Sequence, residues 1–202
     1  MARKRIDVLS DTHGRLSREV FDAIDGCDLI VHAGDITSED DFITLGAIAP
    51  LRLCLGNNDW AGEYGADVTR KVRFEYEGLQ FCVTHYQQNL TGERFDVGVF
   101  GHTHVPETRT LNSGALMINP GSPTFPRSQA GPTMGRLVVE GGRVVSSESI
   151  RLAPDEDRGW GRSFFAGWSP GTEGRVFCPR LLDSSQPQIP RKMPLTLSLN
   201  WR

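Results

Sequence analysis

The stretch IDVLSDTHG (residues 6–14) begins as a short apolar strand and ends in an aspartate, a histidine and a glycine. Side chains two positions apart on an extended chain project to the same side, so Asp11 and His13 point together from the end of the predicted strand. A carboxylate and an imidazole in this arrangement could be two ligands of one metal ion. They could also form a hydrogen-bonded pair at a turn, because Asp-x-His is common.

Predicted strands and helices alternate through the first sixty residues. Ser17 is the expected N-cap of the first helix, and Thr37, which has capping-box spacing to Asp40, is that of the second. This alternation is typical of parallel βαβ units. Buried strands are expected at residues 5–10, 28–35 and 51–59, and helices at residues 16–25 and 37–49.

The second half of the domain is rich in strands instead. Residues 71–85 alternate apolar and polar side chains around Glu77-Gly78, and residues 135–150 turn at Gly141-Gly142, so both segments are expected to be hairpins. An α/β first half and a β-rich second half favour two packed sheets with helices outside them.

Composition and charge narrow the class of protein. The 202 residues carry a formal charge of −3, which offers no basic surface for a polymeric nucleic acid. The basic start MARKR is followed by too few apolar residues for a signal peptide, and no segment approaches a membrane span. We therefore expect a cytoplasmic protein with no membrane partner and without nucleic acid as its main partner.

The chain from residue 152 onward differs from the rest. It holds six of the twelve prolines and three of the four tryptophans, and it follows neither a strand nor a helix period. We expect one domain at residues 1–151 and an irregular or disordered tail at residues 152–202. The tail's large aromatic residues, which could dock on the domain or on a partner, are Trp160, Phe164, Phe165 and Trp168.

Polar residues recur where the predicted buried strands end. Ligands of α/β sheets bind at the carboxyl ends of the strands, so these side chains are expected to meet. Each of these residues, taken alone, could belong to an ordinary turn or be a hydrogen-bonded surface histidine. Their recurrence at the ends of several predicted strands favours a single shared site. The candidate ligands are Asp11, His13, Asp35, Asn57, His85, His102 and His104.

The candidate ligands offer carboxylate, amide and imidazole donors and no thiolate. Such donors suit five- or six-coordinate Mn, Fe, Co or Zn rather than a closed structural zinc site. Seven candidates are too many for one ion that keeps an open position. They suit two ions about 3.5–4 Å apart that share a bridging carboxylate.

A family resemblance follows from these motifs. SDTHG, GDI, GNND, TH and GHTH, followed by NPGSP, occur in the order seen in calcineurin-like metallophosphoesterases. The chain resembles most closely their small single-domain YfcE-type phosphodiesterases, whose fold a eukaryotic retromer subunit shares. The resemblance covers residues 5 to about 150. It implies an α/β fold, a four-layer α-β-β-α sandwich of two packed mixed sheets flanked by helices.

The resemblance also implies roles for single residues. Asp59 is expected to steady a histidine beside the metals, so Asn57, Asp59 and His85 are the candidate catalytic residues. Two divalent ions are expected, with manganese first and Fe, Ni, Co or Zn as alternatives. The ligand set implied is Asp11, His13 and His104 for one metal, Asn57, His85 and His102 for the other, and Asp35 as the bridge.

The leading interpretation is an enzyme that hydrolyses small phosphate esters, as a phosphodiesterase or phosphatase, with hydroxide activated by two metals. One alternative is a binding module or scaffold that keeps the fold with little catalysis. Another is a nucleotide-specific phosphatase of the same superfamily. The full ligand set favours an enzyme. No residue pattern indicates the oligomeric state.

Three features depart from the family pattern. Asn58 stands where many relatives have a histidine that protonates the leaving group, and Tyr86 stands where they have glycine. Only sixteen residues separate His85 from His102, whereas relatives have a longer segment that includes a helix. The short segment would leave one side of the site open or displace His85. His32 is expected to be a hydrogen-bonded strand histidine rather than a ligand.

Overall fold

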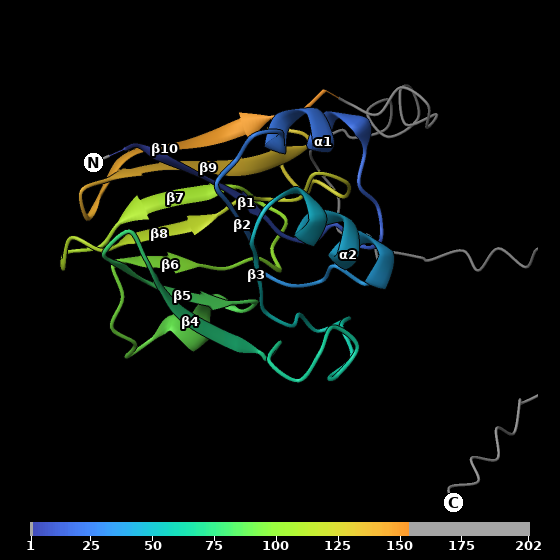
Figure 1. Cartoon of the computed structure of the whole chain (residues 1–202), viewed down its shortest axis with the longest axis horizontal. Coiled ribbons are helices and arrows are strands. Elements are labelled where there is room, and N and C mark those ends of the chain that lie inside the picture. The colour runs from blue at the N-terminus through green and yellow to red at the C-terminus, as the bar shows by residue number, and fades with distance from the viewer. Residues whose placement is uncertain (1, 154–202) are drawn as a thin grey trace, which may run out of the picture. The chain divides into compact units, whose positions relative to one another are not determined.

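The structure, a computed structural model, describes residues 2–153 of the chain (Figure 1). Two five-stranded sheets, two α-helices and one 3₁₀ helix make up this part of the chain. Nearly all of the predicted tail, with its aromatic residues, lies outside the described residues, so the domain boundary at residue 151 stays a prediction. No helix among residues 2–153 is long and apolar enough to cross a membrane.

The first sheet contains the predicted βαβαβ unit. Its strand order is β10-β9-β1-β2-β3, with β1, β2 and β3 parallel and β9 antiparallel to β1. Helices α1 (Arg18–Ile24) and α2 (Glu39–Ile48) form the two crossovers. The strands are β1 (Lys4–Leu9), β2 (Leu29–His32), β3 (Leu51–Leu53), β9 (Thr133–Glu140) and β10 (Arg143–Arg151).

The second sheet has the order β4-β5-β6-β8-β7. Strands β4 and β5 form the predicted hairpin, whose turn residues Glu77 and Gly78 have φ of 51° and 80°. Strands β5, β6 and β8 run parallel, so their carboxyl ends share one edge of the sheet. The strands are β4 (Lys71–Tyr76), β5 (Leu79–Thr84), β6 (Val97–Val99), β7 (Glu107–Thr110) and β8 (Leu116–Asn119).

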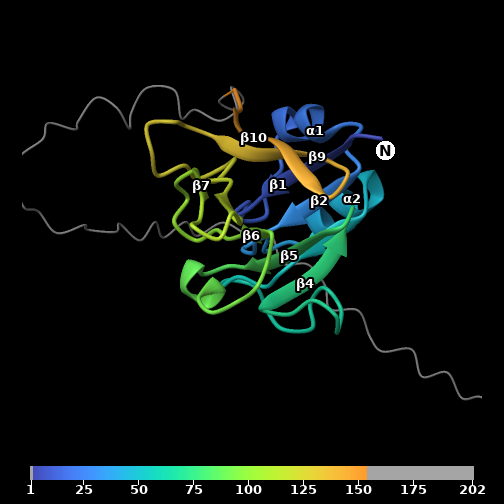
Figure 2. The ribbon, with the colours of Figure 1, turned by 90° about the vertical axis from the view of Figure 1, so that its left-hand side faces the viewer.

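The two sheets pack face to face (Figure 2). The space between them is filled by buried side chains from both sheets, among them Ile6, Val8 and Val31 of the first and Phe81 and Val99 of the second. Burial of apolar side chains at this interface removes them from water and provides much of the driving force for folding. The interface also fixes the two carboxyl edges next to each other.

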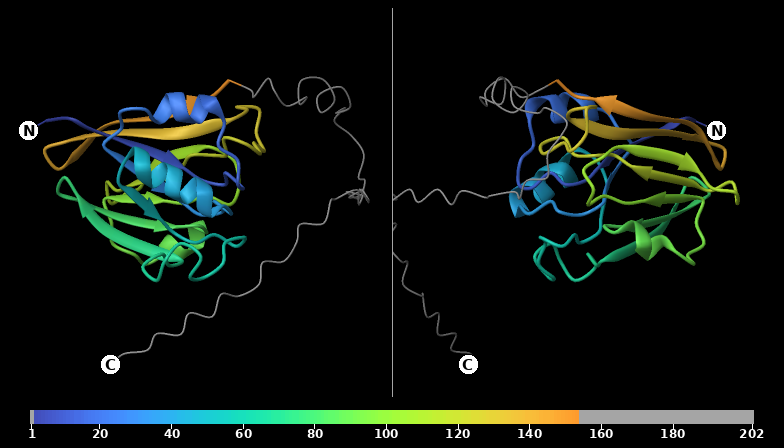
Figure 3. Two further views of the ribbon diagram at one scale, coloured as in Figure 1. Left: turned by 45° about the vertical axis from the view of Figure 1, so that its right-hand side comes forward. Right: turned by 180° about the vertical axis from the view of Figure 1, so that it is seen from behind.

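Helices cover the two sheets unequally. Helices α1 and α2 both lie on the outer face of the first sheet (Figure 3), where Val20, Ile24 and Leu45 are buried. Among residues 2–153, the second sheet is covered by only one helix, the 3₁₀ helix η1 (Gln87–Leu90). Leu90 of η1 is buried in a small apolar cluster with Cys82, Phe100 and Met117. The predicted α/β fold of two mixed sheets is confirmed, and its second helical layer is reduced to one turn because the connecting segment is short.

The helix caps match the prediction in one case. Ser17 is the N-cap of α1, as expected. The expectation that Thr37 caps α2 is wrong by one residue, because the hydroxyl of Ser38 accepts a hydrogen bond from the backbone N–H of Asp41. A serine followed three residues later by an acidic residue gives the same capping pattern as Thr37 with Asp40.

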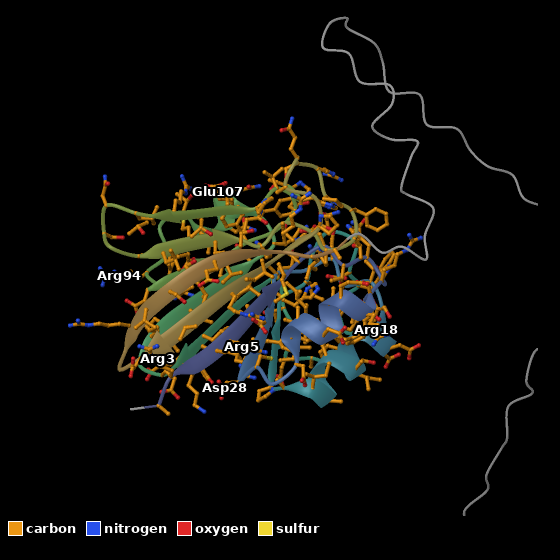
Figure 4. All side chains as sticks on the ribbon, turned by 90° about the horizontal axis from the view of Figure 1, so that it is seen from above. Arg3, Arg5, Arg18, Asp28, Arg94 and Glu107 are labelled. Atoms are coloured by element: carbon orange, nitrogen blue, oxygen red, sulfur yellow. The ribbon has the colours of Figure 1, made fainter. Side chains whose placement is uncertain are left out.

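A buried carboxylate in β1 ties the sheet to α1. Both oxygens of Asp7 accept from Arg136, with its Nε 2.7 Å away, and Arg5 approaches within 3.3 Å. Arg136 and Arg5 also donate to backbone carbonyls at the end of α1, those of Ala23 and Ile24. The backbone N–H of Arg5 donates to Asp28 beside it (Figure 4). The buried charge is therefore fully paired.

Candidate metal centre

The carboxyl edges of the two sheets meet at one place. Beyond β1, Asp11 N–H donates to the carbonyl of Gly34, so the loops after β1 and β2 stay paired. Across the sheets, His102 N–H donates to Asp11 Oδ2 at 3.0 Å, and His85 Nδ1 donates to the carbonyl of Ala33 at 2.8 Å. The structure brings all seven predicted ligands around the point where these loops converge.

Asp11, His13 and His104 form the first group of ligand atoms. One potential ligand atom from each lies within 4.8 Å of the others. Nε2 of His104 is 3.2 Å from Asp11 Oδ1 and 3.4 Å from His13 Nε2. The Nδ1 of His104 donates to the carbonyl of Phe125, which leaves the lone pair of the neutral ring on Nε2, facing Asp11.

Asn57, His85 and His102 form the second group. The Oδ1 of Asn57 is 3.0 Å from His85 Nε2 and 3.1 Å from His102 Nδ1. His85 is buried and in place, so the short segment that follows it has not displaced it. Asn57 and His102 are exposed, which leaves this side of the centre open to solvent.

Asp35 lies between the two groups. Its Oδ2 is 3.5 Å from His85 Nε2 and 4.0 Å from His13 Nε2, a position suited to the predicted bridge. Asn58 holds this carboxylate by donating from its backbone N–H to Oδ1 and from its side chain to Oδ2. Asp11 also lies near this position, since its carboxylate is within 4.8 Å of ligand atoms of Asp35 and His85 as well.

The donor atoms fit divalent cations. Asp11 Oδ1 is buried and accepts no hydrogen bond, which is costly for a carboxylate unless a cation binds there. Because His85 Nδ1 donates to a carbonyl, its neutral ring turns a lone pair toward the Oδ1 of Asn57, which is also only an acceptor. Acceptors that face acceptors repel each other, and a cation between them removes the repulsion.

Electrostatics set the protonation states that metal binding needs. Burial alone would raise the pKa of Asp35, but contacts with His85 and Asn58 outweigh it and hold that pKa well below its usual range. Burial lowers the pKa of His13 and of His102. Burial would also lower the pKa of His85, but the carboxylate of Asp35 raises it. A metal ligand must be an ionised carboxylate or a neutral imidazole, and Asp35, His13 and His102 are shifted that way.

The backbone at the centre is conformationally strained. Seven non-glycine residues among residues 2–153 have positive φ, a region that costs side-chain-bearing residues energy. Such strain gathers at functional sites, where the surrounding structure enforces it. Five of the seven are predicted ligands, namely Asp11, His13, Asp35, His102 and His104.

Two glycines allow the loops to close on the carboxylates. A Cβ at Gly56 would collide with Asp35, and one at Gly101 would collide with Ser10 and press on Asp11. The G-N and G-H pairs of the motifs therefore mark positions where backbone must approach a ligand closely.

Asp59 does not act as predicted. The expectation that it steadies a histidine is wrong, because its carboxylate accepts from the backbone N–H groups of Asp35, Gly56 and Thr37 at 2.7–2.9 Å. It therefore braces the loop that carries Asp35, the predicted bridge. A carboxylate two residues after a ligand looks the same in sequence whether it contacts a ring or a backbone amide.

His32 is a structural residue, as predicted. Its ring is fully buried, with Nε2 3.1 Å from the hydroxyl of Thr12 and Nδ1 accepting from the N–H of Gly34. Burial lowers the pKa of His32 to about 4, so the ring is neutral at pH 7. Its ring nitrogens therefore already have partners.

Two sets of contacts that hold predicted ligands in place were not predicted from the sequence. The hydroxyls of Ser122 and Thr124 in the NPGSPT loop donate to the carbonyl of Asp11, which holds the strained backbone there. The hydroxyl of Tyr86 donates to Asn57 Oδ1 at 3.2 Å. The motif NPGSP signalled only a turn, and Tyr86 was visible only as a departure from glycine.

Comparison with known proteins identifies the family to which a chain with this arrangement of residues belongs. Residues 5–142 match the profile of the calcineurin-like phosphoesterase superfamily domain. A probable metallophosphoesterase of Methanothermobacter thermautotrophicus is 35% identical over 162 residues, which cover 72% of this chain and 91% of that protein. A probable metallophosphoesterase of Methanocaldococcus jannaschii is 32% identical over 139 residues, covering 60% of this chain and 69% of that protein.

Solved structures share the fold at lower identity. A conserved uncharacterized protein of Streptococcus pneumoniae, described as a predicted phosphoesterase, has a TM-score of 0.59 at 23% identity, covering 77% of this chain and 95% of that one. The phosphoesterase YfcE of E. coli has a TM-score of 0.56 at 17% identity, covering 74% and 100%. Vacuolar protein sorting 29 of Cryptosporidium parvum has a TM-score of 0.59 at 17% identity, covering 74% and 98%.

Proposed function

The chain belongs to the calcineurin-like phosphoesterase superfamily, and from this membership we propose that it hydrolyses phosphate esters with two divalent metal ions. The family and its metallophosphoesterase relatives support metal-dependent phosphoester hydrolysis. One observation carries the two-metal proposal. Two groups of potential ligand atoms, one with His13 and His104 and one with Asp35 and His85, share the buried carboxylate of Asp11, whose Oδ1 has no hydrogen bond.

In this proposal Asp11, His13 and His104 hold one ion, Asn57, His85 and His102 hold the other, and Asp35 joins the two. Divalent ions held there would neutralise charge on phosphate oxygens and lower the pKa of a water toward about 7. Manganese is the ion we propose first, with Fe, Ni, Co or Zn as alternatives, because the donors are carboxylates, an amide oxygen and imidazoles.

The surroundings of the centre bear on the substrate. Its exposed side, at Asn57, Asn58 and His102, admits a substrate from solvent. Asn58 has no acidic proton to give, and its amide is already engaged with Asp35. We therefore propose small phosphate esters whose leaving group departs without a proton, such as aryl phosphodiesters or monoesters. The net charge of −3 argues against polymeric nucleic acid as the substrate.

Hydrolysis of activated esters tests this function. Metal-free protein is assayed on bis(p-nitrophenyl) phosphate and p-nitrophenyl phosphate with Mn, Ni, Co, Zn or Mg added singly, and with EDTA as the control. We expect turnover with at least one metal and none with EDTA. A protein that binds two equivalents of metal but hydrolyses neither ester would favour the binding-module alternative.

A further inference from the structure

The amide of Asn57 has two ends of nearly equal size. Only its oxygen can bind a metal, so rotation of the amide by 180° would present the NH₂ group to the centre instead. Two ring nitrogens, His85 Nε2 and His102 Nδ1, already lie about 3 Å from Oδ1. A third polar group near this oxygen therefore bears directly on whether it faces the metal.

Tyr86 supplies this third group. Its hydroxyl donates to Asn57 Oδ1 at 3.2 Å, which uses one lone pair of the oxygen and leaves the other for a metal. Its ring lies against His102, with centroids 4.5 Å apart, and against His85, with centroids 5.3 Å apart. Tyr86 thus touches every predicted ligand of the second group.

The short segment after His85 fixes Tyr86 in this place. The carbonyl of Tyr86 accepts from the hydroxyl of Thr84 at 3.0 Å and from the N–H of Asn89 at 3.1 Å. Tyr86 is the N-cap residue of η1, and Leu90 at the other end of η1 is buried against the second sheet. The backbone is therefore anchored on both sides of the side chain.

We propose that Tyr86 is a positioning residue of the second metal site, which keeps the oxygen of Asn57 and the ring of His102 turned toward the metal. The inference rests on the proposed two-metal function and adds to it a residue outside the predicted ligand set. Groups that orient metal ligands in this way change metal affinity by about 10–100-fold when they are removed.

The first experiment compares two tyrosine-to-phenylalanine variants. Tyr86→Phe removes only the hydroxyl at the centre, and Tyr76→Phe makes the same change on half-buried β4, which contributes no predicted ligand. Metal-free proteins are titrated with Mn²⁺ by calorimetry, and their melting temperatures without metal are compared. We expect Tyr86→Phe to weaken one of two sites about 10–100-fold, with the other site and the metal-free melting temperature unchanged. Tyr76→Phe should match the wild type.

A second experiment isolates orientation from other effects. In Asn57→Asp both terminal atoms are oxygens, so turning the group costs no ligand. In the Asn57→Asp background, Tyr86→Phe should therefore change the metal affinity of the second site by less than about threefold. That change is much smaller than the loss of affinity of about 10–100-fold expected for Tyr86→Phe in the wild-type background. An equal loss in both backgrounds would overturn the orienting role.

The outcomes separate this inference from the proposed function. If the wild type binds two ions and Tyr86→Phe binds them equally well, the inference is wrong and the proposed function stands. If the wild type has a single site, the two-metal function fails and the role of Tyr86 fails with it.

Discussion

Two buried aspartates, Asp7 within β1 and Asp11 just beyond its carboxyl end, have opposite surroundings. Asp7 has both oxygens held by Arg136 and lies in regular strand pairing. Asp11, four positions later, has one oxygen without a hydrogen bond and a φ of 55°. Burial of a carboxylate is costly in both places. At Asp7 an arginine meets that cost, whereas at Asp11 two imidazoles lie near an oxygen without a hydrogen bond, an arrangement that suits the proposed cation.

The difference shows that a carboxylate within a strand can tie layers of the fold together, while one just beyond the strand's end is left for the proposed metal site. Arg136 and Arg5 bind Asp7 together with the end of α1, so that network joins layers of the fold. The hydrogen bonds at Asp11 join loops instead of layers and hold its strained backbone in place. They leave Oδ1 of Asp11 without a hydrogen bond. The same substitution at the two positions should therefore have different consequences.

The largest expected effect is the loss of turnover in Asp11→Asn. Replacement of the carboxylate by a neutral amide weakens a proposed ligand of one ion that also lies beside Asp35 and His85, so we expect activity to fall about 10³-fold or more. Unfolding of the metal-free protein should change little, since Oδ1 has no hydrogen bond to lose. Kinetics with saturating metal and urea unfolding in EDTA measure both. Full activity in Asp11→Asn would remove the distinction between the two aspartates.

Asp7→Asn should have the reverse result. The substitution removes the buried charge of Asp7 and leaves the half-buried guanidinium of Arg136 without a charge partner, so the free energy of unfolding should fall by about 3 kcal/mol. The folded fraction should keep its metal content and its turnover. Urea unfolding and metal analysis of the folded protein check this. A loss of stability no larger than that of Asp11→Asn would contradict the comparison.

The buried ring of His32 should make stability depend on pH. Its pKa is about 4 in the folded chain and about 6.5 in the unfolded chain, so the unfolded chain binds more protons between these values. Stability is therefore complete above about pH 6.5 and falls by about 3 kcal/mol as the pH drops toward 4.

His32→Gln removes this titration and can still hydrogen-bond Thr12. Urea unfolding of both metal-free proteins at pH 7 and pH 4.5 gives the stability that each loses between these pH values. The contributions of the other titrating groups cancel when the two losses are subtracted. The variant should lose about 2–3 kcal/mol less than the wild type. Equal losses would mean that His32 does not titrate as its burial predicts.

The smallest expected effect concerns the leaving group. Asn58→His places an imidazole where the wild type has no acid, so esters with poor leaving groups should react up to about 10²-fold faster than in the control. Asn58→Ala is the matched control, because it loses the same hydrogen bond to Asp35 without adding an acid. Rates across a series of aryl diesters measure the dependence. A wild-type series that does not depend on leaving-group pKa would show that another residue supplies the proton.

Local patterns were enough to predict the sheets and the place of the site. The i, i+2 pairs Asp11 with His13 and His102 with His104 stand at strand ends, and strand ends of parallel sheets meet at one edge. The contacts that hold these ligands were less visible. Tyr86 contacts Asn57, which lies 29 positions earlier in the chain, and Asp59 accepts from backbone amides rather than contacting a histidine ring. Such contacts depend on how loops close, which residue types alone do not specify.

The most direct test of the two-metal centre is the metal content of three proteins. Wild type, Asp35→Ala and His32→Gln are stripped with chelator, saturated with Mn²⁺, freed of excess metal and measured by elemental analysis. We predict two equivalents in the wild type and in His32→Gln. We predict fewer than one equivalent in Asp35→Ala, whose bridging carboxylate is gone while its fold remains. Two equivalents retained in Asp35→Ala, or a single equivalent in the wild type, would contradict the assignment of a shared two-metal centre.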